Sequence, residues 1–573
     1  MTRRFSMHVL ASSILRMDAN WVDYLLIALY FVFVLGIGLS ARASISSSID
    51  FFLSGRSLPA WVTGLAFISA NLGAVEIMGM SANGAQYGMA TFHYYWIGAI
   101  PAMLFLGVVM MPFYYGSKVR SVPEFMLRRF GPEAHLVNAI SFAVAQILIA
   151  GVNLYLLATI VNALLGWTIW VSTVAAAIIV LSYITLGGLS AAIYNEVLQF
   201  FVIVAALLPL TLLALHEVGG WNGLKDKMSA AGTSNQLDSW PGTTITTYSS
   251  SFWSVVGIVF GLGFVLSFGY WTTNFVEVQR AMASKDMNSA RRAPIIGSFP
   301  KMFIPFIIII PGMMAAVLIS PLAKLKSSGG ASGAGGITYN DSLLLLMKQL
   351  LPNGLLGVAI AGLLAAFMAG MAANISAFNT VMSYDIWQTY IQKDKPDRFY
   401  TAFGRGATVV ATALAIGTSY FASQFPNIMT YLQTLFGFFN APLFATFILG
   451  MFWKRMTATA AWTGLVSGTL AAVLVAFLSE DAFGSASTGF LHVGGQGASF
   501  LAAGAAFIVD VAVSVAVTFV TESKPDSELR GLVYSETPKE DLHDEHEDHW
   551  WLAPTKLAGV SLVMVIILNV IFR

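Results

Sequence analysis

One stretch of this sequence places a carboxylate inside an apolar segment. Residues 69–84 are SANLGAVEIMGMSANG, and they contain Glu76, two asparagines and two interior glycines, Gly73 and Gly79. An ionisable side chain within a membrane span is costly, so it faces a cavity or a partner instead of lipid. Irregular backbone at that depth is tolerated only where it is buried in protein or lines a cavity. The stretch therefore predicts a broken helix beside a polar cavity that Glu76 faces.

The composition is that of a protein embedded in a lipid bilayer. The chain has 573 residues, of which 57% are hydrophobic and 10% are charged, against about 25% charged residues in soluble domains. The net charge of +1 gives no reason to expect a nucleic-acid partner. There is no cysteine, and the HExxH, GxSxG and GxxxxGK[ST] motifs do not occur, so we expect no enzyme and no organic cofactor. Nothing in the sequence indicates an obligate protein partner.

Apolar runs of about 20 residues predict an all-α integral membrane protein. Fourteen spans are expected, at about 21–39, 58–80, 92–114, 135–165, 168–186, 190–216, 252–276, 297–320, 354–387, 400–423, 428–452, 458–478, 497–521 and 551–571. Lys and Arg are enriched in the inner loops if both termini lie outside. This asymmetry predicts a bacterial inner-membrane protein with extracytoplasmic termini.

Two spans carry interruptions at corresponding places. Asn71 to Gly73 interrupt the second span, and four glycines lie in the seventh. Discontinuous helices at matching positions in two halves are typical of secondary transporters. The expected organisation is a tail with the first helix (1–57), a five-helix repeat (58–216), an outer loop (217–251), a second repeat (252–452), accessory helices (453–521), an acidic inner loop (522–550) and a last helix (551–573).

Six motifs follow one another in order: ANLGAVEIMGMSANG, YYWIGAI, GGLSAAIYNEVLQ, YWTTNFVEVQRAMASKDM, AGLLAAFMAGMAANISAFNTVMSYDIW and LGMFWKR. Together they make the chain resemble the sodium:solute symporter family, in its sodium/glucose cotransporter branch, over about residues 20–480. The resemblance implies a LeuT-type fold with two inverted five-helix repeats and alternating access. It also implies a small-molecule substrate and a coupling cation bound beside the first and eighth core helices.

The residues that the resemblance implies for the ion are only partly kept. The carbonyl positions are Ser69, Leu72 and Ala366, and the two hydroxyl positions carry Ala369 and Gly370. Sodium prefers oxygen ligands, and neither of these side chains has one. Sodium coupling and proton coupling therefore both stay open. The oxygens that could compensate are the side chains of Ser69, Asn374 and Ser376.

The substrate positions implied by the resemblance are Glu76, Tyr95, Gly98, Ser267, Lys301 and Gln433, with Tyr270 and Trp271 as the gate. They predict a small polar solute, with a sugar as the first choice and an organic acid or polyol as alternatives. One hypothesis is that Glu76 takes up and releases a coupling proton. Its rival is that Glu76 bonds the solute or pairs with Lys301.

Other polar groups have two interpretations each. The resemblance implies that Glu196 is an inner-gate or ion-exit residue, and the alternative is a plain charge at a helix end. Asp385 is expected to be structural. The acidic loop with His543, His546 and His549 is expected to be solvated, with metal ligation as the alternative. A solute sensor that keeps the fold and lacks the usual sodium site is the remaining alternative function.

Overall fold

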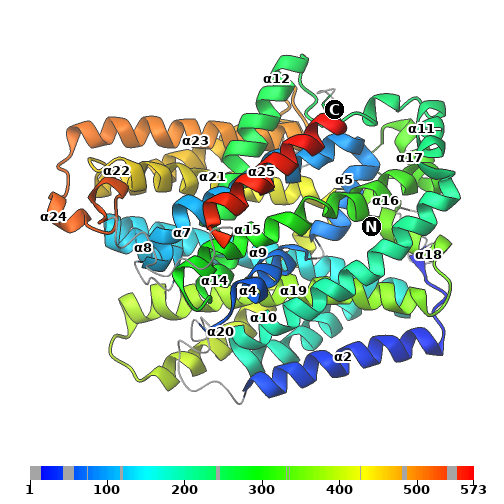
Figure 1. The fold of residues 1–573 in the computed structure, drawn as a ribbon, viewed down its shortest axis with the longest axis horizontal. Helices are drawn as coiled ribbons and strands as arrows, with labels where there is room; N and C mark the ends of the chain where they lie inside the picture. The colour runs from blue at the N-terminus through cyan, green and yellow to red at the C-terminus, as the bar shows by residue number, and fades with distance from the viewer. Residues whose placement is uncertain are drawn as a thin grey trace.

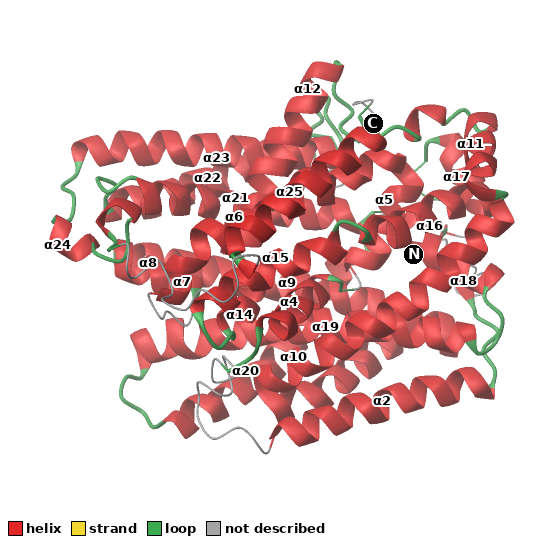
Figure 2. Ribbon diagram, viewed as in Figure 1, coloured by secondary structure: helices red, strands yellow, loops and turns green. Residues whose placement is uncertain are grey.

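The computed structural model describes residues 15–42, 57–73, 75–116, 121–240, 245–330, 332–333, 336–425, 427–480, 487–538 and 552–573. Over these residues the chain is helical throughout, and the helices lie side by side along the long axis of the molecule (Figures 1 and 2). Within this part of the chain the only β-type pairing is an isolated bridge between Leu58 and Ser284. The all-helical fold predicted from the sequence is confirmed.

The first half of the chain begins with a helix at the edge of the bundle and continues into the broken helix. Its helices are α2 (Trp21–Arg42), α4 (Ala60–Asn71), α5 (Met80–Tyr87), α6 (Ile100–Phe105), α7 (Met111–Gly116), α8 (Val122–Phe130), α9 (Pro132–Leu165), α10 (Ile169–Val218) and α11 (Gly220–Ala230). Wider π-helical turns join several of them, at Val75–Gly79, Tyr94–Ala99 and Leu106–Met110. Helix α9 ends at Gly166, whose φ of 70° suits glycine.

The second half contains the helices that complete the cavity and then the accessory helices. They are α12 (Ser251–Val256), α13 (Phe268–Thr273), α14 (Phe275–Met282), α15 (Met287–Lys301), α16 (Ile304–Leu318), α17 (Ser320–Ser328), α18 (Ser342–Leu350), α19 (Leu355–Thr380), α20 (Asp397–Ala422), α21 (Ile428–Phe452), α22 (Ala458–Leu478), α23 (Gly495–Val520), α24 (Asp526–Leu529) and α25 (Pro554–Ile571). Gly257–Ser267 and Val381–Ile391 are π-helical. Three of the four glycines of the seventh predicted span lie in this first π-helical segment and Gly269 lies in α13, so the interruption expected there is absent from the described helix.

The expected number of spans is not confirmed. Among the described residues, eleven helices are long and apolar enough to cross a membrane, or up to twelve if the bent pair Ala60–Asn71 and Val75–Phe92 is one span. Two shorter apolar helices lie at Trp21–Val34 and Ile169–Ser182. The predicted spans 168–186 and 190–216 are both part of α10, apart from the N-cap residue Thr168, so the short glycine-containing stretch between them (GGL, residues 187–189) does not end the helix.

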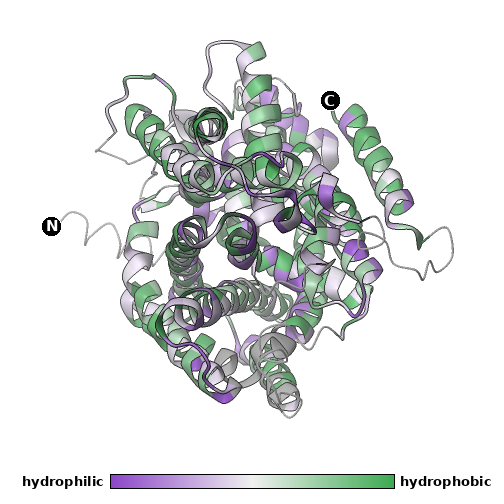
Figure 3. Ribbon diagram, turned by 90° about the vertical axis from the view of Figure 1, so that its left-hand side faces the viewer, coloured by the Kyte–Doolittle hydropathy of each residue, from purple (hydrophilic) through white to green (hydrophobic). Residues whose placement is uncertain are grey.

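The bundle keeps apolar side chains on its outside as well as in its core. Trp21, Val32 and Phe252 are exposed, as expected where lipid replaces water as the solvent. Figure 3 views one end of the molecule and places the C-terminal helix α25 at the outer edge of the bundle. Inside, α4 packs against α15, α9 against α19 and α20, and α21 against α23. The broken helix is thus enclosed by helices from both halves.

Two predicted loops contain more helix than expected. The outer loop 217–251 includes α11. The acidic inner segment includes the short α24. Residues 539–551, with His543, His546 and His549, lie outside the described residues.

Candidate functional site

The site is built around the end of α4. This helix ends at Asn71, and the next helical segment begins at Val75 with a bend of 55° between the two parts. The Leu72 amide still donates to the Ile68 carbonyl at 2.9 Å, and the Gly73 carbonyl accepts from Ile77 at 3.1 Å. The last carbonyls of a helix have no partner within it and carry its partial negative charge. The helix break expected from the stretch around Glu76 is thus present, and the carbonyls at the end of α4 mark its negative pole.

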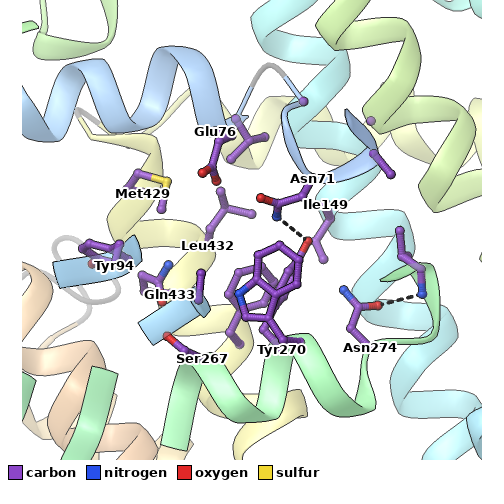
Figure 4. Close-up of a pocket in the computed structure, with 18 of the residues that line it drawn as sticks. Asn71, Glu76, Tyr94, Ile149, Ser267, Tyr270, Asn274, Met429, Leu432 and Gln433 are labelled. Carbon is purple, nitrogen blue, oxygen red and sulfur yellow. Dashed lines mark hydrogen bonds between the residues drawn. The ribbon is translucent and has the colours of Figure 1, made fainter. Parts of the chain in front are cut away.

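A cavity of about 100 Å³ opens beside this break. Figure 4 shows Asn71 and Glu76 from the broken helix facing Tyr270, Ser267 and Gln433 from other helices. The polar residues that line it are Asn71, Glu76, Tyr94, Asn153, Ser267, Tyr270, Asn274, Lys301, Asn374 and Gln433. Its remaining walls are aromatic, aliphatic and glycine residues. A mostly apolar cavity with a few converging polar groups is the usual form of a small-molecule site.

Lys301 and Glu76 form an ion pair in this cavity. Lys301 Nζ lies 2.7 Å from Glu76 Oε1, and it also donates to Asn71 Oδ1. The same ammonium lies 4.8 Å from the ring centroid of Tyr95 and 5.4 Å from that of Trp271. The ammonium is thus held by a carboxylate, an amide and two π-faces. In the sequence analysis, pairing of Glu76 with Lys301 was an alternative to a proton-carrying role for Glu76. The structure contains this pair.

A hydrogen-bonded chain leads from this ion pair towards α14. Asn71 Nδ2 donates to the Tyr270 hydroxyl at 3.1 Å, and that hydroxyl donates to Glu277 Oε1 at 2.7 Å. The Glu277 side chain is fully buried, and its Oε2 has no hydrogen-bond partner among the described residues. Burial raises the pKa of Glu277 from 4.5 to about 7. Sequence reasoning missed Glu277, although it is the one acidic residue of the stretch FVEVQRAM.

The predicted substrate positions come together in the structure. Glu76, Ser267, Lys301 and Gln433 line the cavity, together with the predicted gate residues Tyr270 and Trp271. The Tyr95 ring contacts the ammonium of Lys301. Gly98 packs so closely on Ser267 that a side chain at residue 98 would collide with the Ser267 hydroxyl. Glycine at this position therefore leaves room for the serine.

Glu196 lies apart from the cavity and is sealed into a different ion pair. Arg280 on α14 donates to it through two nitrogens, at 2.7 and 3.4 Å, and both side chains are fully buried. Arg280 also donates to the Val276 carbonyl at 3.0 Å and to Gln279 Oε1 at 3.2 Å. The pair joins α10 to α14, and since Glu277 and Arg280 are three residues apart, they share one face of α14.

One of the predicted ion positions, the Ala366 carbonyl, lies at the contact between two glycines. A Cβ on Gly73 would lie 3.3 Å from the Gly370 Cα and 3.6 Å from the Ala366 carbonyl oxygen. Ser69 is buried and its hydroxyl has no hydrogen-bond partner in the described part of the chain. Leu72 is buried at the end of α4. The side chain of Ala369 is not among those described.

Of the residues considered from sequence as sources of a compensating oxygen, Asn374 is part of the cavity wall. Ser376 instead offers its carbonyl to the Thr380 hydroxyl at 3.0 Å. Asn153, which sequence reasoning missed, lines the cavity from α9. An asparagine within an apolar run was the available signal, since buried amides need partners.

Asp385 forms a polar cluster near the beginnings of α8 and α9. It accepts from the Ser121 hydroxyl at 2.7 and 2.6 Å, and it lies 3.2 Å from Nε2 of the buried His135. His135 Nδ1 lies 2.7 Å from the Tyr390 hydroxyl. These bonds tie the end of the helix that follows α19 to the first half of the chain, in agreement with a structural role for Asp385.

A broken membrane helix that faces a polar cavity within a helical bundle is typical of secondary transporters. Comparison with known proteins gives the family: the model of the sodium:solute symporter family matches residues 51–468. The chain belongs to the sodium:solute symporter family. It is accordingly an integral membrane protein of a transporter family, not of an enzyme family, as its composition and motifs predicted.

Individual relatives agree with this assignment. The chain is 28% identical to a sodium/glucose cotransporter of Vibrio parahaemolyticus over 471 residues, which are 80% of this chain and 86% of the relative. It is 29% identical to the sodium/glucose cotransporter 2 of Rattus norvegicus, over 82% of this chain and 73% of the relative. The solved structure of a Na⁺-coupled sialic acid symporter in a substrate-bound outward-open state superposes with a TM-score of 0.70 at 17% identity. That match covers 88% of this chain and all of the other, and it bears out the LeuT-type fold.

Proposed function

We propose that this protein is a cation-coupled symporter of a small polar organic solute, most readily a sugar, which works by alternating access. The observation that carries the proposal is the cavity at the end of α4, where Glu76, Lys301, Tyr270 and Gln433 converge. The relatives named as sodium/glucose cotransporters support the same substrate class. A solute sensor would have the same fold, and net accumulation of solute is the property that separates the two.

The charges of the cavity favour a neutral solute over an organic acid. The ammonium of Lys301 is already neutralised by Glu76 at 2.7 Å, so the cavity offers an anion no unpaired positive charge from this pair. What remains are hydrogen-bonding groups such as Ser267 and Gln433 and aromatic surfaces such as Trp271. Hydroxyl groups can donate to and accept from these side chains, and sugar rings pack on aromatic faces. A sugar or polyol meets these requirements.

In the proposed cycle, the end of α4 binds the cation and the neighbouring cavity binds the solute. The Tyr270 hydroxyl connects Asn71 on α4 with Glu277 on α14, so it links the broken helix to α14. In alternating access the cavity opens to one side of the membrane and then to the other. We expect α14 to move relative to α4 in this change, which breaks the connection. Both ligands favour the state that they bind better, and this difference couples their movements.

Sodium is the proposed coupling ion, and a proton is the second candidate. The Glu76 carboxylate is already engaged by Lys301 at 2.7 Å. Glu277 is the better candidate: it is buried, one of its oxygens has no partner among the described residues, and its pKa is raised to about 7.

Uptake of labelled glucose into proteoliposomes tests the proposal, with an imposed sodium gradient or an imposed proton gradient, each alone. We expect accumulation above the outside concentration with sodium alone. Accumulation with protons alone would assign the coupling to the second candidate. Equilibration without accumulation under both gradients would contradict coupled symport and favour a uniporter or sensor.

The proposed location is a bacterial inner membrane with both termini extracytoplasmic, since Lys and Arg are more frequent in the loops that this arrangement places inside. Labelling of a single cysteine introduced after Arg573, with an impermeant reagent on intact cells, tests the orientation. The chain has no cysteine of its own that would react. Labelling only after the cells are opened would contradict it.

A further inference from the structure

Asn153 is a buried residue of the cavity wall, and its amide oxygen takes part in none of the contacts described above. It lies on α9 and is only 3% exposed. Its Nδ2 donates to the Ile149 carbonyl at 3.3 Å, one turn earlier on the same helix. This bond fixes the orientation of the amide, because the reverse orientation would set two acceptor oxygens against each other. Asn153 Oδ1 is left without a hydrogen-bond partner among the residues that the structure describes.

The free oxygen points into the gap where α4 meets α19. A Cβ on Gly370 would lie 2.9 Å from Asn153 Oδ1, and a Cβ on Gly73 would lie 3.6 Å from the same oxygen. Real Cβ atoms essentially never come closer than 3.0 Å to a neighbour. A side chain at residue 370 and the Asn153 oxygen therefore compete for one space. The glycine at this position is what admits the amide oxygen.

A second oxygen faces the same gap, and the electrostatics there suit a cation. The Ala366 carbonyl oxygen lies 3.6 Å from the Cβ position of Gly73, as the Asn153 oxygen does. The gap also lies at the C-terminal end of α4, where the partial charge of a helix is negative. A buried oxygen without a partner costs about 1–3 kcal/mol, so a bound ligand that satisfies it is favoured. Unwound carbonyls and helix C-terminal ends are known sites of cation coordination in transporters.

The chemistry of these oxygens selects a monovalent hard cation. Amide, carbonyl and hydroxyl oxygens are neutral, and Glu76, a carboxylate of the same cavity, is already paired with Lys301. Such a neutral oxygen set suits a singly charged ion that prefers oxygen ligands. The buried Ser69 hydroxyl, which has no partner within the described ranges, comes from the same helix end.

We infer that Asn153 Oδ1 is a ligand of the coupling cation and replaces a hydroxyl that Ala369 and Gly370 lack. The amide reaches the site from α9, whereas the missing hydroxyls would have come from α19. The exchange keeps an oxygen at the ion while moving its origin to a different helix. This inference rests on the proposed cation coupling and does not depend on the identity of the solute.

Thermal unfolding of the purified full-length protein in detergent, without solute, tests the inference. The Tm is measured against NaCl, with choline chloride holding the ionic strength constant. We expect the wild-type Tm to rise saturably with sodium, because an ion that binds only the folded state stabilises it. The Asn153→Ala variant should need at least about tenfold more sodium for the same rise in Tm, which corresponds to about 1.4 kcal/mol. A wild-type Tm that does not respond to sodium would overturn the inference.

The matched control is Asn138→Ala, the same substitution at another buried asparagine of α9. It should leave the sodium dependence unchanged even if it lowers the Tm. Equal loss of sodium dependence in both variants would assign Asn153 a structural role only. Since no solute is present, failure of glucose uptake would count against the proposed substrate and not against this ligand.

A double substitution keeps the inference falsifiable if Asn153→Ala is poorly folded. Gly370→Ser alone should weaken the sodium response, because its Cβ would lie 2.9 Å from Asn153 Oδ1. Combining Gly370→Ser with Asn153→Ala should restore it, since the serine hydroxyl then takes the place of the amide oxygen. Asn153→Asp should retain the response as well. A double variant no better than the worse single variant would contradict the shared position of the two oxygens.

Discussion

Two ion pairs of the same length occupy very different places in this molecule. Lys301 and Glu76 lie 2.7 Å apart in the cavity, where the Glu76 side chain is 12% exposed. Arg280 and Glu196 also lie 2.7 Å apart, but both of their side chains are 0% exposed. The first pair has a cavity beside it, and the second has protein on every side.

The difference lies in how much hydrogen-bonding capacity each pair retains. The Arg280 guanidinium uses its nitrogens on Glu196, on the Val276 carbonyl and on Gln279. The Glu76 carboxylate accepts from Lys301 through Oε1 and faces the cavity. A sealed pair fixes the relative position of helices, whereas a pair beside a cavity can exchange one of its bonds for a bond to a solute. The two pairs should therefore fail in different ways when they are broken.

The largest expected effect comes from breaking the sealed pair. Glu196→Gln leaves the Arg280 charge buried without a counter-ion, which costs about 3–5 kcal/mol, and the Tm should fall sharply. The control is Asp526→Asn, which breaks the exposed pair with Lys454 at 3.0 Å and should cost about 1 kcal/mol or less. Equal Tm changes in the two variants would mean that burial does not distinguish these pairs.

The next effect concerns pH and Glu277, which lies between the two pairs. Its pKa is about 7 in the folded protein against the ordinary 4.5. Between these values the folded state keeps a proton that the unfolded state loses, so stability falls as the pH rises through this window. The decrease is at most about 3 kcal/mol. Glu277→Gln should flatten the dependence of Tm on pH, and an unchanged slope would assign it to other groups.

Breaking the cavity pair should affect transport more than stability. Glu76→Gln leaves Lys301 its bond to Asn71 and its contacts with Tyr95 and Trp271, so the Tm should change less than with Glu196→Gln. The uncompensated ammonium should lower the affinity for a neutral solute about tenfold, or 1.4 kcal/mol, measured as the KM of sodium-driven uptake. Proton-driven uptake that is unchanged in this variant would exclude Glu76 as the proton carrier.

The smallest expected effect comes from the hydroxyl that joins the cavity to α14. Tyr270→Phe removes the bonds to Asn71 and Glu277 and should cost about 1 kcal/mol in stability. The rate of uptake should change, because this bridge must break in every cycle. Tyr114→Phe is the control, since its hydroxyl donates to the Thr272 carbonyl at 2.9 Å. If both variants transport alike, the bridge has no part in the cycle.

The sequence was a good guide where the physics is local. The length of apolar runs predicted membrane helices, and the cost of a charge in lipid predicted that Glu76 faces a cavity at a helix break. The expected number of spans is not confirmed, because α10 continues through a short glycine-containing stretch and two apolar helices are short. Local composition does not decide whether a helix bends, ends or continues.

Partners between distant segments were decided only by the tertiary structure. Glu76 meets a lysine 225 residues away in the chain, and Tyr270 connects Asn71 with Glu277. The family resemblance places the missing hydroxyls at residues 369 and 370, and the substitutes considered from sequence were Ser69 and two residues of the same helix. The ligand that we propose, Asn153, lies on α9. The sequence determined that positions 369 and 370 carry no side-chain oxygen, because alanine and glycine have none. Which side chain takes that place at the proposed cation site depends on how closely Gly73 and Gly370 let their helices approach, and only the packed structure sets that distance.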